Sequence, residues 1–463
     1  SSWYEFFPRS VGRTPGAKLR ECADVLPELA RMGFDVVYLP PVHPIGRKHR
    51  KGRNNVTTAG PDDPGSPWAI GAGEGGHKAI HPDLGTLEDF EHFVKAAREL
   101  GIEIAMDLAF QCSPDHPYVA EHPEWFRWRP DGSIQHAENP PKKYEDIVPF
   151  DFECDAWQGL WEELRSVVLF WIEQGVRIFR VDNPHTKAFP FWEWLIGDVK
   201  ASYPEVLFLS EAFTRPKIMY RLAKLGFSQS YTYFTWRNSA WELAEYVREL
   251  TRTEVREYFR PNFWPNTPDI LPEFLQYGGR PAFLIRLILA GTLSSNYGIY
   301  GPAFELLASD AVPGREEYLD SEKYEIKRWD PSRPESLEAL VTRLNRIRRE
   351  NPALQTTGNT RFFDSGNESV LFFGKQTEDA LNTLLVAVSL DPYRTQTCQL
   401  RVPREELGIP PGRPFLVHDL LGDDKFVWHA EVNRIDLEPH VLPARIFRVR
   451  TQLRREQDFD YFM

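Results

Sequence analysis

Short β-rich runs alternate with amphipathic stretches along roughly the first three quarters of this 463-residue chain. Most runs are almost continuously hydrophobic, as expected for strands that are buried on both faces of a parallel sheet. The stretches between them, such as 87–100, 157–174 and 192–203, have the apolar spacing of helices. The successive runs are 3–7, 34–39, 102–108, 176–181, 206–209, 229–234, 260–263 and 291–300. This order predicts an α/β fold with a closed parallel (β/α)8 barrel, the TIM barrel, rather than an open sheet.

Two connections of the predicted barrel are too long for simple loops. Residues 44–76 follow the second run and are rich in Gly, Pro, Arg and Lys, and residues 111–151 follow the third run. Long connections in a compact domain usually carry function, and both leave the C-terminal ends of strands, where barrel enzymes place their sites. Segment 111–151 contains its own turn signal, at 130–132, and predicts a loop subdomain after the third strand.

The pattern of hydrophobic residues changes near residue 355. Short alternating runs separated by turns follow at 370–373, 384–388, 399–402, 415–417 and 445–449. This pattern predicts a C-terminal antiparallel β-sandwich. We therefore expect a catalytic barrel at 1–355, including the loop subdomain 111–151, and a β-sandwich domain at 356–463.

Charge and cysteine content narrow the possible functions. The formal net charge of −12 argues against nucleic acid or an anionic membrane as a partner, because no overall positive field attracts them. The first residues lack the charged and apolar regions of a signal peptide. The four cysteines, at 22, 112, 154 and 398, form no CxxC pair, which predicts reduced thiols, a cytoplasmic location and no metal site.

Acidic residues stand at the ends of consecutive predicted strands. The third run leads to Asp107, the fourth to Asp182 and the fifth to Glu211, and Asp269 follows the seventh. All strands of a parallel barrel end at one mouth, so we expect these side chains to converge. Cleaving a glycosidic bond with retention needs an ionised carboxylate that attacks and a carboxylic acid that donates a proton, about 5–5.5 Å apart.

Acids at strand ends can also merely cap the helices that follow. This alternative stays open for Asp107 and is weaker for Asp182 and Glu211, because Arg180 lies two residues before Asp182. Side chains alternate along a strand, so Arg180 is expected on the same face as Asp182, where its charge keeps the carboxylate ionised. The pattern favours a catalytic pair.

The motifs FRVD, ending in Asp182, SEA, around Glu211, and the third-strand Asp107 together resemble the signature motifs of the α-amylase family. The resemblance includes the excursion after the third strand and the small C-terminal β-domain, so it covers the whole chain. It implies that Asp182 is the nucleophile, that Glu211 is the acid/base and that Asp269 grips sugar hydroxyls.

Two departures from the amylase pattern narrow the function further. Gln111 and Cys112 stand where the family has Asn-His, and Pro268 replaces the His that normally precedes Asp269. The two imidazoles that ordinarily contact the transferred sugar are therefore absent. A plain starch hydrolase is not expected.

One subgroup resembles this combination closely, the bacterial maltosyltransferases that extend α-1,4-glucans or maltooligosaccharides with α-maltose 1-phosphate. The similar stretches are HRKGRNN (49–55), SPWAIG (66–71), QCSPDHP (111–117), ENPPKKY (138–144) and NTPD (266–269). The resemblance implies a retaining glycosyltransferase that needs no metal or organic cofactor. It associates the donor's maltosyl phosphate with Lys51, Gln111, Asn139, Lys142, Tyr144 and Asn183.

The loop residues give this implication a physical basis. Lysine binds phosphate as a point charge, whereas Asn and Tyr donate directional hydrogen bonds. A run of lysines alone more often forms a solvated surface, but over the mouth of an acidic barrel we expect it to bind the donor. Arg180, Asp107 and Trp68 complete the expected substrate-binding set, Trp68 either stacking on a sugar or filling the core. His116, His122 and His185 lack metal-site spacing and are expected to be structural.

Two alternatives remain open. The chain is another α-amylase-family transglycosidase, hydrolase or phosphorylase, or it is a non-catalytic amylase-like module that binds glycans. Such modules usually lack one of the carboxylates, and all three are present here. Members of the subgroup carry further N-terminal domains and associate as dimers, which implies a homodimer for the full-length protein.

Overall fold

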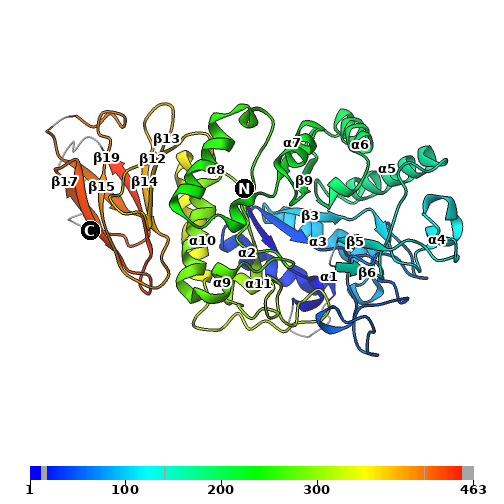
Figure 1. Cartoon of the computed structure of the whole chain (residues 1–463). Coiled ribbons are helices and arrows are strands. Elements are labelled where there is room, and N and C mark those ends of the chain that lie inside the picture. The colour runs from blue at the N-terminus through cyan, green and yellow to red at the C-terminus, as the bar shows by residue number, and fades with distance from the viewer. Residues whose placement is uncertain (12–17, 140–141, 411, 451–463) are drawn as a thin grey trace.

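The computed structural model describes residues 1–11, 18–139, 142–410 and 412–450, and Figure 1 shows a large α/β body beside a smaller β body. Seven parallel strands form the main sheet, in the order β10-β9-β8-β3-β2-β1-β11. Segment 260–263 joins its two edges through parallel bridges of Pro261 to Ser230 and of Phe263 to Tyr297, so the sheet closes. The predicted (β/α)8 barrel is confirmed. Its strands are β1 (Ser2–Glu5), β2 (Val36–Leu39), β3 (Glu103–Leu108), β8 (Ile178–Asp182), β9 (Leu207–Glu211), β10 (Gln229–Ser230) and β11 (Tyr297–Tyr300).

Two of the predicted strands are shorter in the structure. β10 stops at Ser230, and Tyr233–Trp236 form the 3-10 helix η7, whose first turn is capped by the Thr232 hydroxyl. The predicted run 291–300 was wrong in its first part, because residues up to Leu293 continue helix α10 (Gly279–Leu293). This helix is apolar and buried on nearly all sides, and periodicity cannot separate such a helix from a buried strand.

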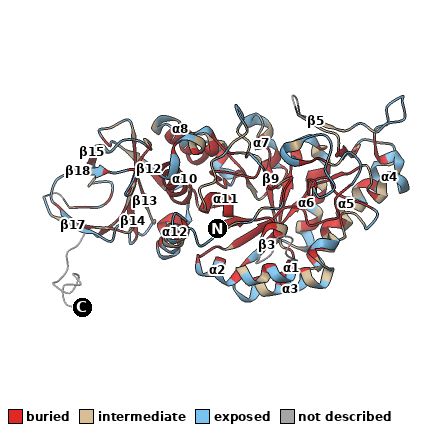
Figure 2. Ribbon diagram, turned by 90° about the horizontal axis from the view of Figure 1, so that it is seen from below, coloured by how far each residue is buried: buried red, intermediate tan, exposed pale blue. Residues whose placement is uncertain are grey.

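Helices surround the barrel, and their exposed sides face outward in Figure 2. The three helices expected between strands are present as α3 (Leu87–Glu99), α5 (Trp157–Glu173) and α6 (Phe189–Ser202). The others are α1 (Leu19–Cys22), α2 (Leu26–Arg31), α4 (Pro117–Glu121), α7 (Pro216–Lys224), α8 (Ala240–Arg252), α9 (Glu273–Tyr277), α11 (Gly301–Glu305) and α12 (Glu338–Glu350). Within the described ranges, none of the helices has the length and apolarity needed to cross a bilayer.

The connection after β3 forms a small body of its own at one side of the barrel. β4 (Gln111–Cys112) pairs with β7 (Val148–Pro149), and β5 (Ala137–Asn139) pairs with β6 (Lys142–Tyr144), both antiparallel. The long connection after β2 packs against it, since Ser113 N donates to Ile70 O at 2.6 Å. The two long connections therefore meet beside the barrel mouth.

The C-terminal part is antiparallel. A six-stranded sheet contains β12 (Thr360–Phe363), β13 (Val370–Gln376), β14 (Thr383–Ser389), β19 (Ala444–Arg450), β16 (Phe415–Asp419) and β17 (Lys425–Trp428), and a second ladder pairs β15 (Gln396–Arg401) with β18 (Val432–Leu437). Lys375 attaches this part to the barrel by donating to Thr292 O at the end of α10, at 3.2 Å. The domain boundary near residue 355 stays a prediction.

Candidate active site

The carboxyl groups of Asp182 and Glu211 lie side by side at the ends of β8 and β9. The two residues are register partners in neighbouring parallel strands, which are spaced about 4.8 Å apart. Both are buried, and the Arg180 guanidinium contacts each of them, with 3.1 Å from Nη1 to Asp182 Oδ1 and 2.7 Å from Nη2 to Glu211 Oε1. The two acids that the sequence analysis selected, Asp182 and Glu211, therefore both contact Arg180 at the mouth of the barrel.

Asp107, at the end of β3, belongs to the same cluster. Its Oδ2 accepts hydrogen bonds from Arg180 Nη1, at 2.8 Å, and from the Tyr38 hydroxyl. The rings of Tyr38 and Tyr231 flank the guanidinium, each with its centroid 5.8 Å from the Arg180 Cζ atom. Asp107 therefore helps to hold Arg180 in position. Its carboxylate accepts hydrogen bonds from Arg180 and Tyr38 and does not act as a helix cap.

Burial controls the protonation of this cluster. Removal from water raises the pKa of Glu211 to about 8, with Arg180 opposing the rise and Asp182 and Asp269 adding to it. Burial likewise raises the pKa of Asp107 to about 7, against the pull of Arg180. Three carboxyl groups share one guanidinium in a buried site, which favours the protonated forms of Glu211 and Asp107. At neutral pH Glu211 is in the protonated form that a general acid requires.

Asn183 follows Asp182 in a left-handed backbone conformation, with φ of 43°. Its backbone N–H donates to Glu211 Oε2 at 3.3 Å. Asn is one of the few residues that tolerate this conformation. The turn after Asp182 thus reaches across to the carboxyl group of the neighbouring strand.

Asp269 lies in the connection that precedes α9 and forms an ion pair with Lys323. Lys323 Nζ also lies 4.8 Å from the centroid of the buried Trp68 ring. Asp269, Lys323 and Tyr144 line a cavity of about 30 Å³, and Asp269 is near enough to raise the pKa of Glu211. The structure therefore groups Asp269, Trp68 and Tyr144 beside the carboxyl cluster.

The other predicted donor-binding residues differ in their surroundings. Lys51 is buried and ion-paired with Glu145, so its charge is compensated within the protein. Gln111 Nε2 donates to Trp68 O at 3.3 Å. The side chains of Asn139 and Lys142 lie outside the described residues.

Sequence reasoning missed two lysines at the site. Lys323 sits in an irregular segment after β11, far from any recognised motif, and only contact with Asp269 reveals it. Lys187 is buried just before α6 and donates to the backbone carbonyls of Asp182 and Asn183, at 3.2 Å each. Its place shortly after the FRVD motif was the one available signal.

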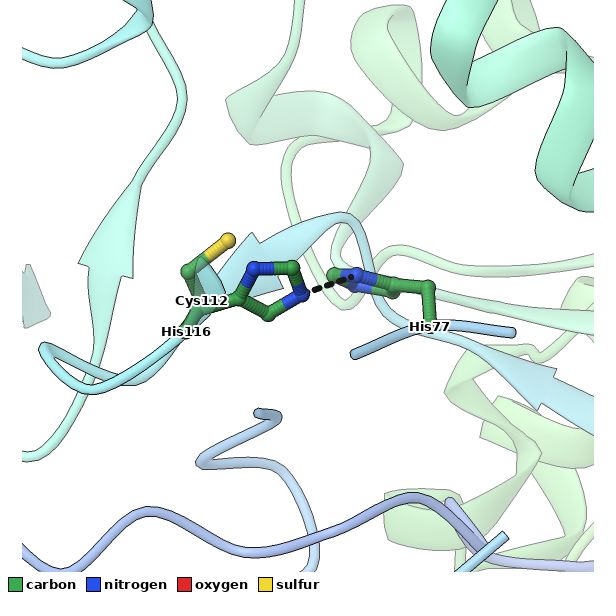
Figure 3. A group of neighbouring side chains, drawn as sticks. All are labelled: His77, Cys112 and His116. Carbon is green, nitrogen blue, oxygen red and sulfur yellow. Dashed lines mark hydrogen bonds between the residues drawn. The ribbon is translucent and has the colours of Figure 1, made fainter. Parts of the chain in front are cut away.

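His116 packs against His77 and Cys112, and their possible ligand atoms all lie within 4.8 Å of one another. Figure 3 shows the two imidazole rings end to end. A hydrogen bond of 3.0 Å joins His116 Nε2 to His77 Nδ1. The backbone N–H of Tyr118 donates to His116 Nδ1, and His77 Nε2 bonds to the carbonyl of Ala109, both at 3.0 Å. Because a carbonyl only accepts, one tautomer satisfies every ring nitrogen.

This relay of histidines is neutral. Burial lowers the pKa of His77 to about 4 and that of His116 to about 2, and it raises the pKa of the Cys112 thiol well above its usual value. Gly71 and Gly76 allow the close approach, since a Cβ at either would lie 2.2 Å from the His116 ring. The two histidines therefore hold the two long connections together. All four of their ring nitrogens are engaged in hydrogen bonds within the protein.

A closed barrel, a subdomain after its third strand and paired carboxyls at the next two strand ends define an α-amylase-like barrel enzyme. A maltogenic α-amylase from Thermotoga neapolitana has a similar fold, with a TM-score of 0.74 at 20% identity over 96% of this chain and 98% of that one. A family model described as "GLGE, C-terminal" matches residues 362–449.

Two relatives are much more similar in sequence. Both are named α-1,4-glucan:maltose-1-phosphate maltosyltransferase. The protein from Chlorobaculum tepidum is 59% identical over 97% of this chain and 68% of its own length. The protein from Myxococcus xanthus is 57% identical over 100% of this chain and 70% of its own. The chain belongs to the α-1,4-glucan:maltose-1-phosphate maltosyltransferase family.

Proposed function

We propose that the chain transfers a maltosyl unit from α-maltose 1-phosphate to the non-reducing end of an α-1,4-glucan, with release of phosphate and retention of configuration. The observation that carries the proposal is the contact of one guanidinium, Arg180, with both Asp182 and Glu211. Two carboxyl groups in unlike protonation states are what a double displacement at an anomeric carbon requires. The names of the relatives supply the donor and the acceptor.

In the first step an Asp182 oxygen attacks the anomeric carbon. The bond from this carbon to the phosphate oxygen breaks, and the bonding pair leaves with the phosphate, which takes the proton of Glu211. Arg180 Nη1 contacts Asp182 Oδ1 at 3.1 Å and orients the carboxylate for this attack. The product of this step is a β-maltosyl ester of Asp182.

In the second step Glu211, now ionised, removes the proton from the acceptor's 4-hydroxyl. The acceptor oxygen attacks the anomeric carbon, and the ester bond to Asp182 breaks. The new glycosidic bond has the α configuration because two inversions have taken place. Asp182 is again a carboxylate and Glu211 is again an acid.

The remaining predicted residues receive binding roles in this proposal. Asp269 takes sugar hydroxyls, together with Lys323, which already pairs with it. Lys51, Gln111 and Tyr144, from the two long connections, are assigned to donor binding, as are Asn139 and Lys142 of the β5–β6 hairpin. Asn183, next to Asp182 in the chain, is assigned a donor-binding role as well. Apart from Lys323, each of these residues carries over from the matching position in the family.

A cytoplasmic location fits the four cysteines, which are all free. We also propose a homodimer for the full-length protein, as the family resemblance implies. Sedimentation or light scattering of that protein tests the stoichiometry directly.

The test of the function is incubation with α-maltose 1-phosphate and maltohexaose. Equimolar phosphate release and products that grow by two glucose units support the proposal. Growth by single units, or release of free maltose in place of chain extension, would assign the chain to another transglycosidase or hydrolase. Asp182→Asn, which keeps the shape of the side chain, is the control for background reactions.

A further inference from the structure

Lys187 is a buried cation beside the catalytic pair whose ammonium group faces the backbone. It caps the 3-10 helix η6 (Pro184–Thr186) directly after the nucleophile. Its Nζ donates to Asp182 O and to Asn183 O, at 3.2 Å each. A lysine is rarely this deeply buried unless its protons are used.

These two carbonyls flank Asn183, whose backbone is in the left-handed conformation. Asn183 has a φ of 43°, a conformation that is unfavourable for a residue other than glycine. Such a conformation persists only where its surroundings enforce it. Besides Lys187, the Thr186 hydroxyl donates to Asn183 O, at 2.8 Å.

The strained turn has a direct effect on the acid/base. In the left-handed conformation the Asn183 N–H points across to β9 and donates to Glu211 Oε2, at 3.3 Å. A hydrogen bond to a carboxylate oxygen favours its ionised form. The direction of this N–H follows from the placement of the two carbonyls that Lys187 holds.

We propose that Lys187 is a positioning residue for the transfer reaction, one that holds the Asp182–Asn183 turn and so aims the Asn183 amide at Glu211. The inference rests on the proposed function for its assay. In this role Lys187 makes no contact with the substrate and acts on the alignment of the nucleophile with the acid/base.

The charge of Lys187 also bears on the cluster. The groups that face it are Asp182, Glu211 and Asp107, which favour its protonated form, and Arg180 and His185, which oppose it. Burial lowers the pKa of Lys187, and the three acids pull it back up. A cation here favours the ionised form of Glu211, so its removal is expected to raise the pKa of that carboxyl group.

Lys187→Met removes the donors and the charge but keeps the methylene stem. We expect kcat to fall by about 10- to 100-fold, the scale of an ångström-sized misalignment, and the alkaline limb of the pH–rate profile to move to higher pH. Lys187→Arg restores a cation with several donors and is expected to recover both. A merely structural lysine would lower the melting temperature and leave the alkaline limb in place.

Lys200→Met is the matched control. Lys200 lies on α6 and donates to the Ser228 hydroxyl at 2.9 Å, away from the carboxyl cluster. We expect this variant to keep kcat and the pH profile of the wild type. A shift of the limb in Lys200→Met equal to that in Lys187→Met would overturn the inference.

A double-mutant cycle with Asn183→Gly tests the route through the turn. Glycine adopts a positive φ without strain, so the turn depends less on Lys187. The loss of kcat caused by Lys187→Met is expected to be at least about fivefold smaller in the Asn183→Gly background, since coupled sites are non-additive. Equal losses in both backgrounds contradict the proposal. Lys187→Gln, which keeps one donor, replaces the Met variant if the latter is unfolded.

Failure of the proposed function is separable from failure of this inference. A wild-type protein that does not extend glucans overturns the function, whereas an active wild type with an unchanged Lys187→Met overturns the inference. The pH dependence of thermal unfolding also follows Glu211 without any turnover. An unchanged dependence in Lys187→Met would count against the role assigned to Lys187.

Discussion

Arg180 and Glu211 are in direct contact, with 2.7 Å between Nη2 and Oε1, yet the pKa of Glu211 stands at about 8. The main cause is burial of the carboxyl group, and Arg180 also bonds Asp182 and Asp107. Burial and the neighbouring acids outweigh one shared cation. The guanidinium orients Glu211 without forcing it to give up its proton.

The pH–rate profile follows from this balance. Glu211 must be protonated to release the phosphate, so we expect kcat/KM to fall as the pH rises through about 8. Phosphate release measured from pH 5 to pH 10 at low donor concentration tests this expectation. A profile that stays flat to about pH 10 would reject Glu211 as the acid.

The same raised pKa predicts a cost in stability. Between the unfolded-state pKa of about 4.3 and the native value of about 8, the native state binds more protons than the unfolded state. The free energy of unfolding therefore falls as the pH rises through this window. The contribution of Glu211 to stability is fully present below about pH 4.3 and is lost as the pH rises toward about 8.

Glu211→Gln removes this ionisation. We expect the variant to melt above the wild type at pH 8, by roughly 3 °C or more, and to approach it near pH 5. Melting temperatures at both pH values measure the difference. A wild type that is the more stable protein at pH 8 would contradict burial as the cause of the shift.

Lys323 is expected to contribute to donor binding. Lys323→Met removes an ion pair with Asp269 and the cation over the Trp68 ring. Charge-assisted hydrogen bonds of about 1.5–3 kcal/mol predict that the KM for donor rises roughly 10- to 100-fold, with a smaller change in kcat.

The control for this prediction is Lys78→Met. Lys78 pairs with Glu163 of α5 at 2.8 Å. This variant should keep the wild-type KM. An unchanged KM in Lys323→Met would remove Lys323 from the donor site.

The sequence predicted the barrel and the convergence of acids because both follow from short-range patterns. Buried parallel strands are continuous apolar runs, and a parallel barrel places all strand ends at one mouth. Arg180 could be placed beside Asp182 because alternation in a strand is regular. The contact from Arg180 to Glu211 follows from neighbouring strands in register.

Long-range contacts in irregular segments could not be predicted. Lys323 meets Asp269 through the folding of a connection that has no periodicity, and the Lys51–Glu145 pair joins two separate long connections. The first residues of the predicted run 291–300 belong to helix α10, which ends at Leu293. The sequence did not reveal this because α10 is buried on nearly all sides. Patterns locate elements, whereas side-chain partners between loops depend on the assembled fold.

The histidine relay predicts a structural role for His77 and His116. His116→Ala leaves buried partners unsatisfied and is expected to cost roughly 1–3 kcal/mol of unfolding free energy. Prolonged treatment with a chelator should change neither activity nor melting temperature. A melting temperature that falls on chelation and returns with zinc would instead identify a metal site.

The central claim is that Asp182 forms a covalent bond with the transferred sugar. The direct test is reaction with a 2-deoxy-2-fluoro-α-maltosyl fluoride, in which fluorine slows breakdown of the ester, followed by mass spectrometry of the peptides. The account predicts one maltosyl adduct, located on Asp182. An adduct on another side chain, or full turnover of donor with no adduct detected under any trapping condition, would contradict it.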